Sequence, residues 1–414
     1  MASNATRRQF LGGLAAASAV TARPAAAPAA ERSENYWEGV RQQFLFHEQR
    51  VPMNAANLCP APRSVASAVT DLTRSINVDC SFQNRARFDR DREAARELVA
   101  GQLGVTADEI ALVRNTSEAN NIVNNGLDLG PDEEVVTWDQ NHPTNNVAWA
   151  VRARRRGFAV RSVTVPADPV GPEDLIEPFR RALTPRTRVL ALTHASNVSG
   201  IRLPVRELCS IAHRQGIHVH VDGAQTWGAL SVDLRELDCD SYAASAHKWY
   251  CGPKEVGLLY VCRERIDRIW PNTVAPGWGA TADTELAGAR KFESMGQRDD
   301  AALSALGTAA EFHAAIGTDQ VEARVLELAS ALKQSLQAIG ARLVTPMDEE
   351  LSAGVCIVDV PSARRQELFE AMYERYGIAG STSGGFRLCP HVYNTRQHVE
   401  RAAQGIEALR GLWA

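Results

Sequence analysis

Lysine is the scarcest charged residue in this chain of 414 residues. The 45 basic residues include only four lysines, Lys248, Lys254, Lys291 and Lys333, so chemistry that needs a primary amine has four candidates. No run of about 18 apolar residues occurs, so we expect no membrane-spanning helix. The net charge of −4 provides no global positive field, so we expect no nucleic-acid partner.

Paired cysteine motifs are also missing. The eight cysteines are scattered, and no Cys-x-x-Cys spacing points to a metal or redox site. We interpret them as mostly buried small apolar residues. The hydrophobic fraction of 45% and the charged fraction of 23% are typical of globular proteins, which excludes disordered and fibrous classes. The length predicts two or three domains, or one large and one small.

The first thirty residues have the pattern of an export signal. Residues 6–11 (TRRQFL) precede a weakly apolar run over 11–20, and an Ala/Pro tract over 22–30 offers a small-residue cleavage site. The Arg-Arg-x-Phe-Leu pattern resembles a twin-arginine signal, and a general secretory signal is the alternative. We expect residues 1–30 to be removed, the twin-arginine export machinery to be a partner, and the mature protein to be periplasmic or exported.

Short β-branched runs alternate with amphipathic helical stretches through the middle of the chain. The predicted strands are 110–113, 135–138, 160–165, 189–193 and 217–221. This rhythm predicts an α/β fold with a parallel sheet covered by helices on both faces. After about residue 300, two long helical patterns precede short strands, which predicts a smaller α+β domain. The expected organisation is a signal (1–30), an N-terminal helix and extended segment (31–55), a large domain (56–300) and a small domain (301–414).

Three side chains that can bind metal alternate along the predicted strand 217–221. Because side chains two apart on a strand share a face, His218, His220 and Asp222 are candidates for a zinc metallohydrolase site, although no convincing fourth ligand follows. Alternatively, Asp222 holds a cofactor at the carboxyl end of a parallel strand, where open α/β sheets bind ligands. A third interpretation is that Asp222 caps the next helix.

Only one of the four lysines lies in an aromatic and glycine-rich context. Lys248 belongs to the stretch 245–249 (SAHKW), which the glycine-rich segment 252–257 follows. A lysine that forms a Schiff base reacts as its neutral amine, so it needs burial or nearby positive charge. Lys254 has Pro and Glu neighbours, and Lys333 falls in an amphipathic helix, where we expect it on the surface.

The stretch 219–260 resembles the cofactor segment of class V aminotransferases, through the combination VDGAQ…SAHKW…GP…G. That family includes isopenicillin N epimerase, cysteine desulfurases and related C–S lyases, and the similarity extends over residues 50–410. It implies fold type I of the enzymes that depend on pyridoxal 5′-phosphate (PLP): a large domain with a mainly parallel sheet between helices, and a smaller α+β C-terminal domain. It also implies a homodimer with shared active sites.

The resemblance also implies roles for individual residues. Lys248 matches the Schiff-base lysine, Asp222 the acid that pairs with the pyridine nitrogen, and His142 the residue that stacks on the ring. Arg387 matches the arginine that binds the substrate carboxylate. The other implied contacts are Thr116, Ser117, Ser245 and His247 at the phosphate, Asn197 and Gln225 at the ring hydroxyl, Asn57 near the substrate, and Gln297, from the partner subunit, near the phosphate.

The implied reaction begins with removal of the Cα proton from an amino acid or an amino-acid-containing peptide, with Lys248 as the base. Epimerisation, transamination and C–S bond cleavage all follow from that step, and the sequence does not separate them. Cysteine desulfurases place a cysteine on the loop shortly before the carboxylate-binding arginine. Here the loop 376–384 has none, so persulfide transfer is not expected. A non-catalytic PLP-binding protein is the remaining alternative.

Overall fold

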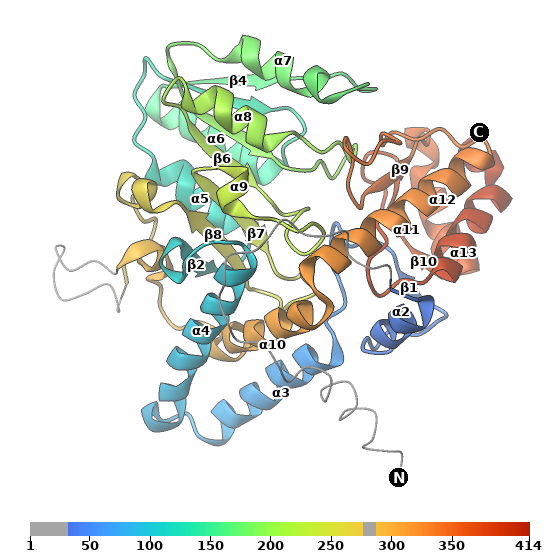
Figure 1. Cartoon of the computed structure of the whole chain (residues 1–414), viewed down its shortest axis with the longest axis horizontal. Coiled ribbons are helices and arrows are strands. Elements are labelled where there is room, and N and C mark those ends of the chain that lie inside the picture. The colour runs from blue at the N-terminus through green and yellow to red at the C-terminus, as the bar shows by residue number, and fades with distance from the viewer. Residues whose placement is uncertain (1–31, 276–286) are drawn as a thin grey trace.

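The computed structural model describes residues 32–275 and 287–414 (Figure 1). The expected export signal, residues 1–30, lies outside the described residues. Within the described ranges, no helix is both long enough and apolar enough to cross a membrane.

A seven-stranded sheet forms the centre of the larger unit. In chain order its strands are β2 (Ile110–Val113), β3 (Glu134–Trp138), β4 (Ala159–Val163), β5 (Thr187–Thr193), β6 (His218–Asp222), β7 (Ser241–Ser245) and β8 (Gly257–Val261). They are arranged in the order β2-β8-β7-β6-β5-β3-β4. Only β8 runs antiparallel to its neighbours, β2 and β7. The predicted α/β class with a mainly parallel sheet is therefore confirmed.

Helices cover both faces of this sheet because its strands are apolar on both sides. The helices of the larger unit are α3 (Arg63–Val78), α4 (Phe82–Gln102), α5 (Thr116–Gly126), α6 (Pro143–Arg156), α7 (Pro172–Ala182), α8 (Val205–His213), α9 (Leu234–Leu237) and α10 (Asp300–Ile316). On β5, Leu190 and Leu192 pack into the core with α4, α7 and α8, whereas Val189 and Ala191 pack into the core with α5 and α6.

The smaller unit lies at one side of the larger one, in orange to red in Figure 1. It contains α11 (Thr318–Ala338), β9 (Cys356–Val358), α12 (Arg365–Tyr376), β10 (Ile378–Ala379), β11 (Phe386–Leu388) and α13 (Arg396–Ala408). The N-terminal elements α2 (Glu34–Arg41) and β1 (Val51–Pro52) join it, since β1 pairs in parallel with β10. The predicted small α+β unit is therefore present, and it includes the N-terminal segment.

The packing partners of the chain change at Gly317 rather than at residue 300, where the sequence predicted the domain boundary. Helix α10 packs against α3 and α4 of the larger unit, whereas α11, which begins at Thr318, packs against α13 and β9. The predicted boundary therefore divides the chain one helix before the packing changes.

Lys333 is buried in α11, with 1% of its surface exposed, so the expectation of a surface lysine is wrong. The loop after α11 brings three oxygen acceptors to its ammonium group: the Pro346 carbonyl at 3.0 Å, the Met347 carbonyl at 2.9 Å and the Ser352 hydroxyl at 2.9 Å. Burial lowers the pKa of Lys333. These acceptors satisfy the three N–H groups, which gives Lys333 a structural role.

Several histidines are buried in the neutral state. Burial lowers the pKa of His194, His220 and His391 to about 3, and that of His218 and His313 to about 4. His313 illustrates the cause: it stacks on the Tyr250 ring at 4.3 Å, and its Nε2 lies 2.9 Å from the Tyr250 carbonyl. An unfolded histidine has a pKa near 6.5, so unfolding in mild acid releases each imidazole to take up a proton.

We therefore expect the melting temperature to fall as the pH is lowered from 7 to 5. The stabilisation is present above about pH 6.5 and is lost as the pH falls toward the folded pKa values. At pH 5 each such histidine lowers the free energy of unfolding by about 2 kcal/mol. His213, whose pKa Asp240 raises, has the opposite effect. Circular dichroism melts measure the change, and His313→Gln should make the decline shallower. A constant melting temperature would contradict this expectation.

Candidate active site

A pocket of about 240 Å³ lies where β5, β6 and β7 end. It is lined by Asn57, Asn115, Thr116, Ser117, His142, Thr144, Thr193, Asn197, Asp222, Ala224, Gln225, Ser245, His247 and Lys248. Of the twelve site residues that the family resemblance implied, ten are in this lining, and Arg387 and Gln297 are outside it. Carboxyl ends of adjacent parallel strands meet at one edge of a sheet, so the fold itself gathers these side chains.

Lys248 is the only lysine that lines this pocket. It follows β7 by three residues and lies in the turn at 246–250. Burial lowers its pKa, the charge of Arg387 lowers it further, and the Asp222 carboxylate acts in the opposite direction. Burial and a neighbouring cation are the two conditions that favour a neutral, nucleophilic amine.

Asp222 is held at the end of β6 with 1% of its surface exposed. Its Oδ1 accepts a hydrogen bond from the Ala224 amide at 3.0 Å, and its Oδ2 accepts one from the Asn120 side chain at 2.8 Å. Sequence reasoning missed Asn120. It lies one helical turn after Thr116, which is the only signal that could have placed it near the pocket.

The N-terminus of α5 lies at the pocket. Asn115 caps the helix by accepting a hydrogen bond from the Glu118 amide at 3.0 Å, and it lines the pocket although the sequence analysis did not select it. The Ser245 hydroxyl accepts from the Thr116 amide at 2.8 Å and lies 2.6 Å from the Thr116 hydroxyl. Together with Ser117 and the dipole of α5, these groups form a place for an anion.

His142 caps the N-terminus of α6 and lines the pocket. Its Nδ1 accepts from the Thr144 amide at 3.3 Å and lies 2.9 Å from the Thr144 hydroxyl. Burial lowers the pKa of His142, and the positive charge of Lys248 lowers it further. The imidazole is therefore a neutral ring at pH 7, and its role in stacking on a cofactor stays a prediction.

Gln225 and Asn197 line the pocket, and each also forms hydrogen bonds to other parts of the protein. The Gln225 amide donates to the Ala56 carbonyl at 3.0 Å and accepts from the Trp249 indole at 2.8 Å. The Asn197 carbonyl accepts from Arg387 at 2.8 Å. These contacts tie the N-terminal segment, the lysine turn and the smaller unit together. A contact of either side chain with a ring hydroxyl stays a prediction.

Arg387 reaches the edge of the pocket from β11 of the smaller unit. It is 3% exposed, and besides the Asn197 carbonyl it donates to the Asn54 side chain at 2.9 Å. Its Nε–H is buried and has no partner among the described residues. A buried guanidinium with an unused donor is suited to a carboxylate ligand, because an unpaired buried donor costs free energy.

Gln297 lies outside the pocket of its own chain. Its side chain is exposed, accepts from Arg85 at 2.7 Å and donates to the Arg298 carbonyl at 2.8 Å. The resemblance placed Gln297 at the partner subunit's site, and that placement stays a prediction.

The proposed zinc site at His218, His220 and Asp222 does not form. In the described part of the chain, the ligand atoms of these three residues do not gather within 4.8 Å. His220 instead lies between Ser241, 2.9 Å from its Nδ1, and Asn120, 2.9 Å from its Nε2. The alternation along the strand places the three side chains on one face, but they form hydrogen bonds with neighbouring polar residues instead of converging on one point.

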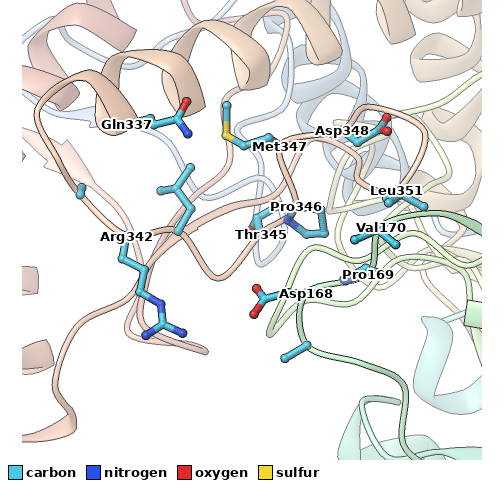
Figure 2. Close-up of a pocket in the computed structure, with 13 residues that line it drawn as sticks. Asp168, Pro169, Val170, Gln337, Arg342, Thr345, Pro346, Met347, Asp348 and Leu351 are labelled. Atoms are coloured by element: carbon cyan, nitrogen blue, oxygen red, sulfur yellow. The ribbon is translucent and has the colours of Figure 1, made fainter. Parts of the chain in front are cut away.

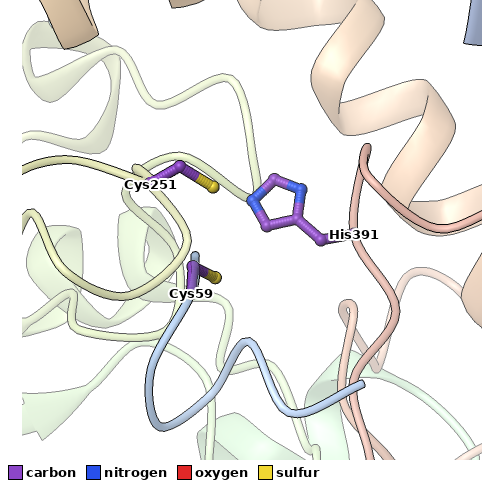
Figure 3. A group of neighbouring side chains, drawn as sticks. All are labelled: Cys59, Cys251 and His391. Carbon is purple, nitrogen blue, oxygen red and sulfur yellow. The ribbon is translucent and has the colours of Figure 1, made fainter. Parts of the chain in front are cut away.

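A different cluster does bring metal-ligand types together: Cys59, Cys251 and His391, with ligand atoms within 4.8 Å of one another (Figure 3). The His391 ring is already occupied, because its Nε2 contacts the Trp249 carbonyl and its Nδ1 accepts from the Val392 amide at 2.7 Å. We therefore interpret the cluster as packing between the N-terminal segment and the lysine turn. Both cysteines are buried, as the sequence analysis expected of most of them.

A larger groove of about 600 Å³ lies between the two units (Figure 2). The segment 167–170 of the larger unit forms one side of it, and residues 337–351 of the smaller unit form the other. It contains none of the twelve site residues that the family resemblance implied, so the smaller pocket at Lys248 is the candidate site.

The family model "Aminotransferase class-V" matches residues 59–405. The chain belongs to this family. Isopenicillin N epimerase of Amycolatopsis lactamdurans is 30% identical over 394 residues, covering 90% of this chain and 98% of the relative. A probable cysteine desulfurase of Methanothermobacter thermautotrophicus is 28% identical, covering 91% and 98%. A crystal structure of a cysteine desulfurase from Escherichia coli superposes with a TM-score of 0.79 at 26% identity, covering 91% and 99%.

Membership of this family makes the protein an enzyme with PLP as cofactor. The pocket fits that group chemically: it has one amine, a carboxylate that can pair with a ring nitrogen, and a helix N-terminus for the phosphate. Thr193 gives an independent indication, since its hydroxyl is buried at the pocket wall and has no partner among the described residues. The residues present therefore fit PLP.

The wild-type holoenzyme should have a visible absorption band that borohydride shifts. We expect the purified Lys248→Ala variant to lack this band. The only amine at the pocket is then gone, and PLP can be retained only noncovalently. Absorption spectra after dialysis measure the loss. Lys254→Ala is the matched control, because Lys254 is exposed and outside the pocket. Cofactor that borohydride still attaches covalently to the Lys248→Ala chain would contradict the assignment.

Proposed function

We propose that this enzyme removes the Cα proton of an amino acid, either free or within a peptide, with Lys248 as the base. The observation that carries the proposal is that a desolvated amine lines the pocket and a buried guanidinium lies at its edge. The charge of Arg387 lowers the pKa of Lys248, so the two groups are close enough to interact electrostatically. A carboxylate bound by the arginine places its Cα within the region that the lysine serves.

Arg387 has the geometry of a carboxylate-binding residue. Its two terminal nitrogens each donate one hydrogen bond to protein oxygens, at Asn197 and Asn54, which fixes the plane of the guanidinium. The Nε–H remains for a ligand, together with the second N–H of each terminal nitrogen. Because the arginine is almost fully buried, the pair that it forms with a substrate carboxylate is shielded from water.

Lys248 supplies the proton acceptor. Its lowered pKa raises the fraction of neutral amine at pH 7, and the neutral amine is the form that can take a proton. The Asp222 carboxylate is positioned to hold a proton on a ring nitrogen, and the groups at Thr116, Ser117 and Ser245 are positioned to hold a phosphate. When bound, PLP supplies an electron sink that stabilises negative charge at Cα.

Three outcomes can follow proton removal: epimerisation, transamination and C–S bond cleavage. The names of the similar proteins, isopenicillin N epimerase and cysteine desulfurase, cover two of these reaction classes. Persulfide transfer is disfavoured for this chain. The loop 376–384 contains no cysteine, and Cys389, two residues after Arg387, is fully buried. A thiol that accepts sulfur from a substrate must reach the pocket, so we favour epimerisation, transamination or elimination without a protein persulfide.

We also propose that the enzyme is a homodimer in which Gln297 serves the partner's site. Supporting this proposal, the surface beside the pocket is partly apolar. Val147 and Val151 project from α6, 56% and 58% exposed, and line a groove that shares Ser117 with the candidate site. An exposed apolar patch beside a site is suited to a subunit contact. Sedimentation velocity should give twice the chain mass, and a monomer would contradict the proposal.

Export by the twin-arginine route is the last part of the proposal. It is supported by the Arg-Arg-x-Phe-Leu pattern of residues 7–11 and the Ala/Pro tract that follows. That route carries folded proteins, so the enzyme would acquire PLP before export. Fractionation of cells that express the native chain should place the mature enzyme outside the cytoplasm, and an exclusively cytoplasmic pool would contradict it.

We expect the holoenzyme in heavy water to exchange the Cα proton of its substrate, found by screening amino acids and peptides by mass spectrometry. Arg387→Ala should lower kcat/KM for exchange roughly tenfold to a hundredfold, because it removes charged hydrogen bonds to the carboxylate. Arg188→Ala is the matched control, since Arg188 pairs with Glu133 at the other end of β5.

The products then separate the three reactions. Exchange with formation of the epimer alone indicates epimerisation, a keto acid indicates transamination, and sulfide with pyruvate indicates C–S cleavage. Holoenzyme that exchanges no Cα proton with any amino acid or peptide would contradict the proposal and support a non-catalytic PLP-binding protein.

A further inference from the structure

The two histidines of β6 that resemble metal ligands have a different use in the structure. His218 and His220 lie on the face of β6 that also carries Asp222, and all three are buried. Between them lie two further buried polar residues, Ser241 of β7 and Asn120 of α5. These five side chains form one continuous series of hydrogen bonds that ends on the Asp222 carboxylate.

The series is joined at short distances throughout. His218 Nε2 lies 3.0 Å from Ser241 Oγ, and the same oxygen lies 2.9 Å from His220 Nδ1. His220 Nε2 lies 2.9 Å from Asn120 Oδ1, and Asn120 Nδ2 donates to Asp222 Oδ2 at 2.8 Å. No member is exposed enough for water to replace a neighbour, so each depends on the next.

The chemistry of each group fixes the direction of every proton. An ionised carboxylate only accepts, so Asn120 must present its NH₂ group to Asp222 and its carbonyl oxygen to His220. His220 therefore carries its proton on Nε2, and its bare Nδ1 accepts from the Ser241 hydroxyl. The Ser241 oxygen then accepts from Nε2–H of His218. Every hydrogen bond in the series donates toward Asp222.

We propose that Asn120 and His220 are positioning residues that keep the Asp222 carboxylate oriented toward the pyridine nitrogen of PLP, with His220 acting through Asn120. This inference rests on the proposed function, in which Asp222 pairs with that nitrogen. Without the donor on His220, the Asn120 amide is free to rotate and present its oxygen to the carboxylate. Asp222 would then hold the ring proton less firmly.

Asn120 also belongs to the helix that begins at the predicted phosphate cradle. It lies on α5, one turn after Thr116, whose amide contacts Ser245 in the predicted phosphate cradle. One helix therefore carries both the anion site and the side chain that orients the carboxylate. Because both groups lie on one rigid helix, the distance between the anion site and the Asp222 carboxylate is fixed. A cofactor that contacts both groups at once would need such a fixed distance.

The test uses holoenzyme reconstituted with PLP labelled with nitrogen-15 in the ring. The nitrogen chemical shift reports directly whether the ring is protonated, which a general loss of stability does not change. In His220→Leu we expect the shift to move toward that of the unprotonated ring. The pH midpoint of the visible band should rise by roughly one unit, because a neutral ring repels a proton on the nearby nitrogen less.

Matched variants separate orientation from packing. His220→Gln keeps an amide donor near the position of Nε2 and should restore most of the wild-type shift. His313→Leu removes another buried neutral histidine outside the pocket, so it should lower stability and leave the ring signal unchanged. Should His220→Leu not fold, Ser241→Ala carries the same test with a smaller cavity. It frees His220 to change tautomer and should move the signal in the same direction.

Wild-type ring signals and midpoints in His220→Leu and Asn120→Ala, or in Ser241→Ala if the leucine variant does not fold, would overturn the inference. A different result would contradict the proposed function: an unchanged ring signal in Asp222→Asn would mean that Asp222 does not pair with the ring nitrogen. If Asp222→Asn moves the signal and the His220, Asn120 and Ser241 variants do not, then Asp222 pairs with the ring without help from this series.

Discussion

The site depends on an electrostatic balance between one amine and one carboxylate, both largely withdrawn from water. Burial and the Arg387 charge favour the neutral form of Lys248, while Asp222 opposes that shift. Desolvation penalises the charged form of each of these two groups. Hydrogen bonds from the Asn120 side chain and the Ala224 amide stabilise the buried Asp222 carboxylate.

The site residues come from neighbouring strands, from helix α5 and from the smaller unit. Strands β6 and β7 are neighbours, and Asp222 ends one while Lys248 follows the other by three residues. Helix α5 brings the anion site and Asn120, and the smaller unit brings Arg387 on β11. The N-terminal segment pairs with the smaller unit through β1 and contacts Gln225 through the Ala56 carbonyl. The pocket is therefore assembled from segments that are far apart in the sequence.

Strand periodicity predicted the sheet and the scarcity of lysine favoured Lys248, whereas most of the other pocket residues were implied only by the resemblance to the family. The alternation of β-branched runs predicted the parallel sheet, and its topology alone brings Thr116, Asp222 and Lys248 to one edge. Asn120 was missed because its position depends on contacts across elements, which spacing does not show, whereas Thr193 ends a predicted strand and could have been placed at this edge. The same limit explains Lys333: an amphipathic pattern could not reveal the loop that supplies its three acceptors.

The central claim is that Lys248 is the amine that binds the cofactor aldehyde. Reduction of the holoenzyme with borohydride, followed by peptide mass mapping, tests it most directly, since the chain offers only four lysines. We predict one phosphopyridoxyl group per chain, on the peptide that contains Lys248. Modification of Lys254, Lys291 or Lys333 in its place, or an unmodified Lys248 in a chain that retains PLP, would contradict the account.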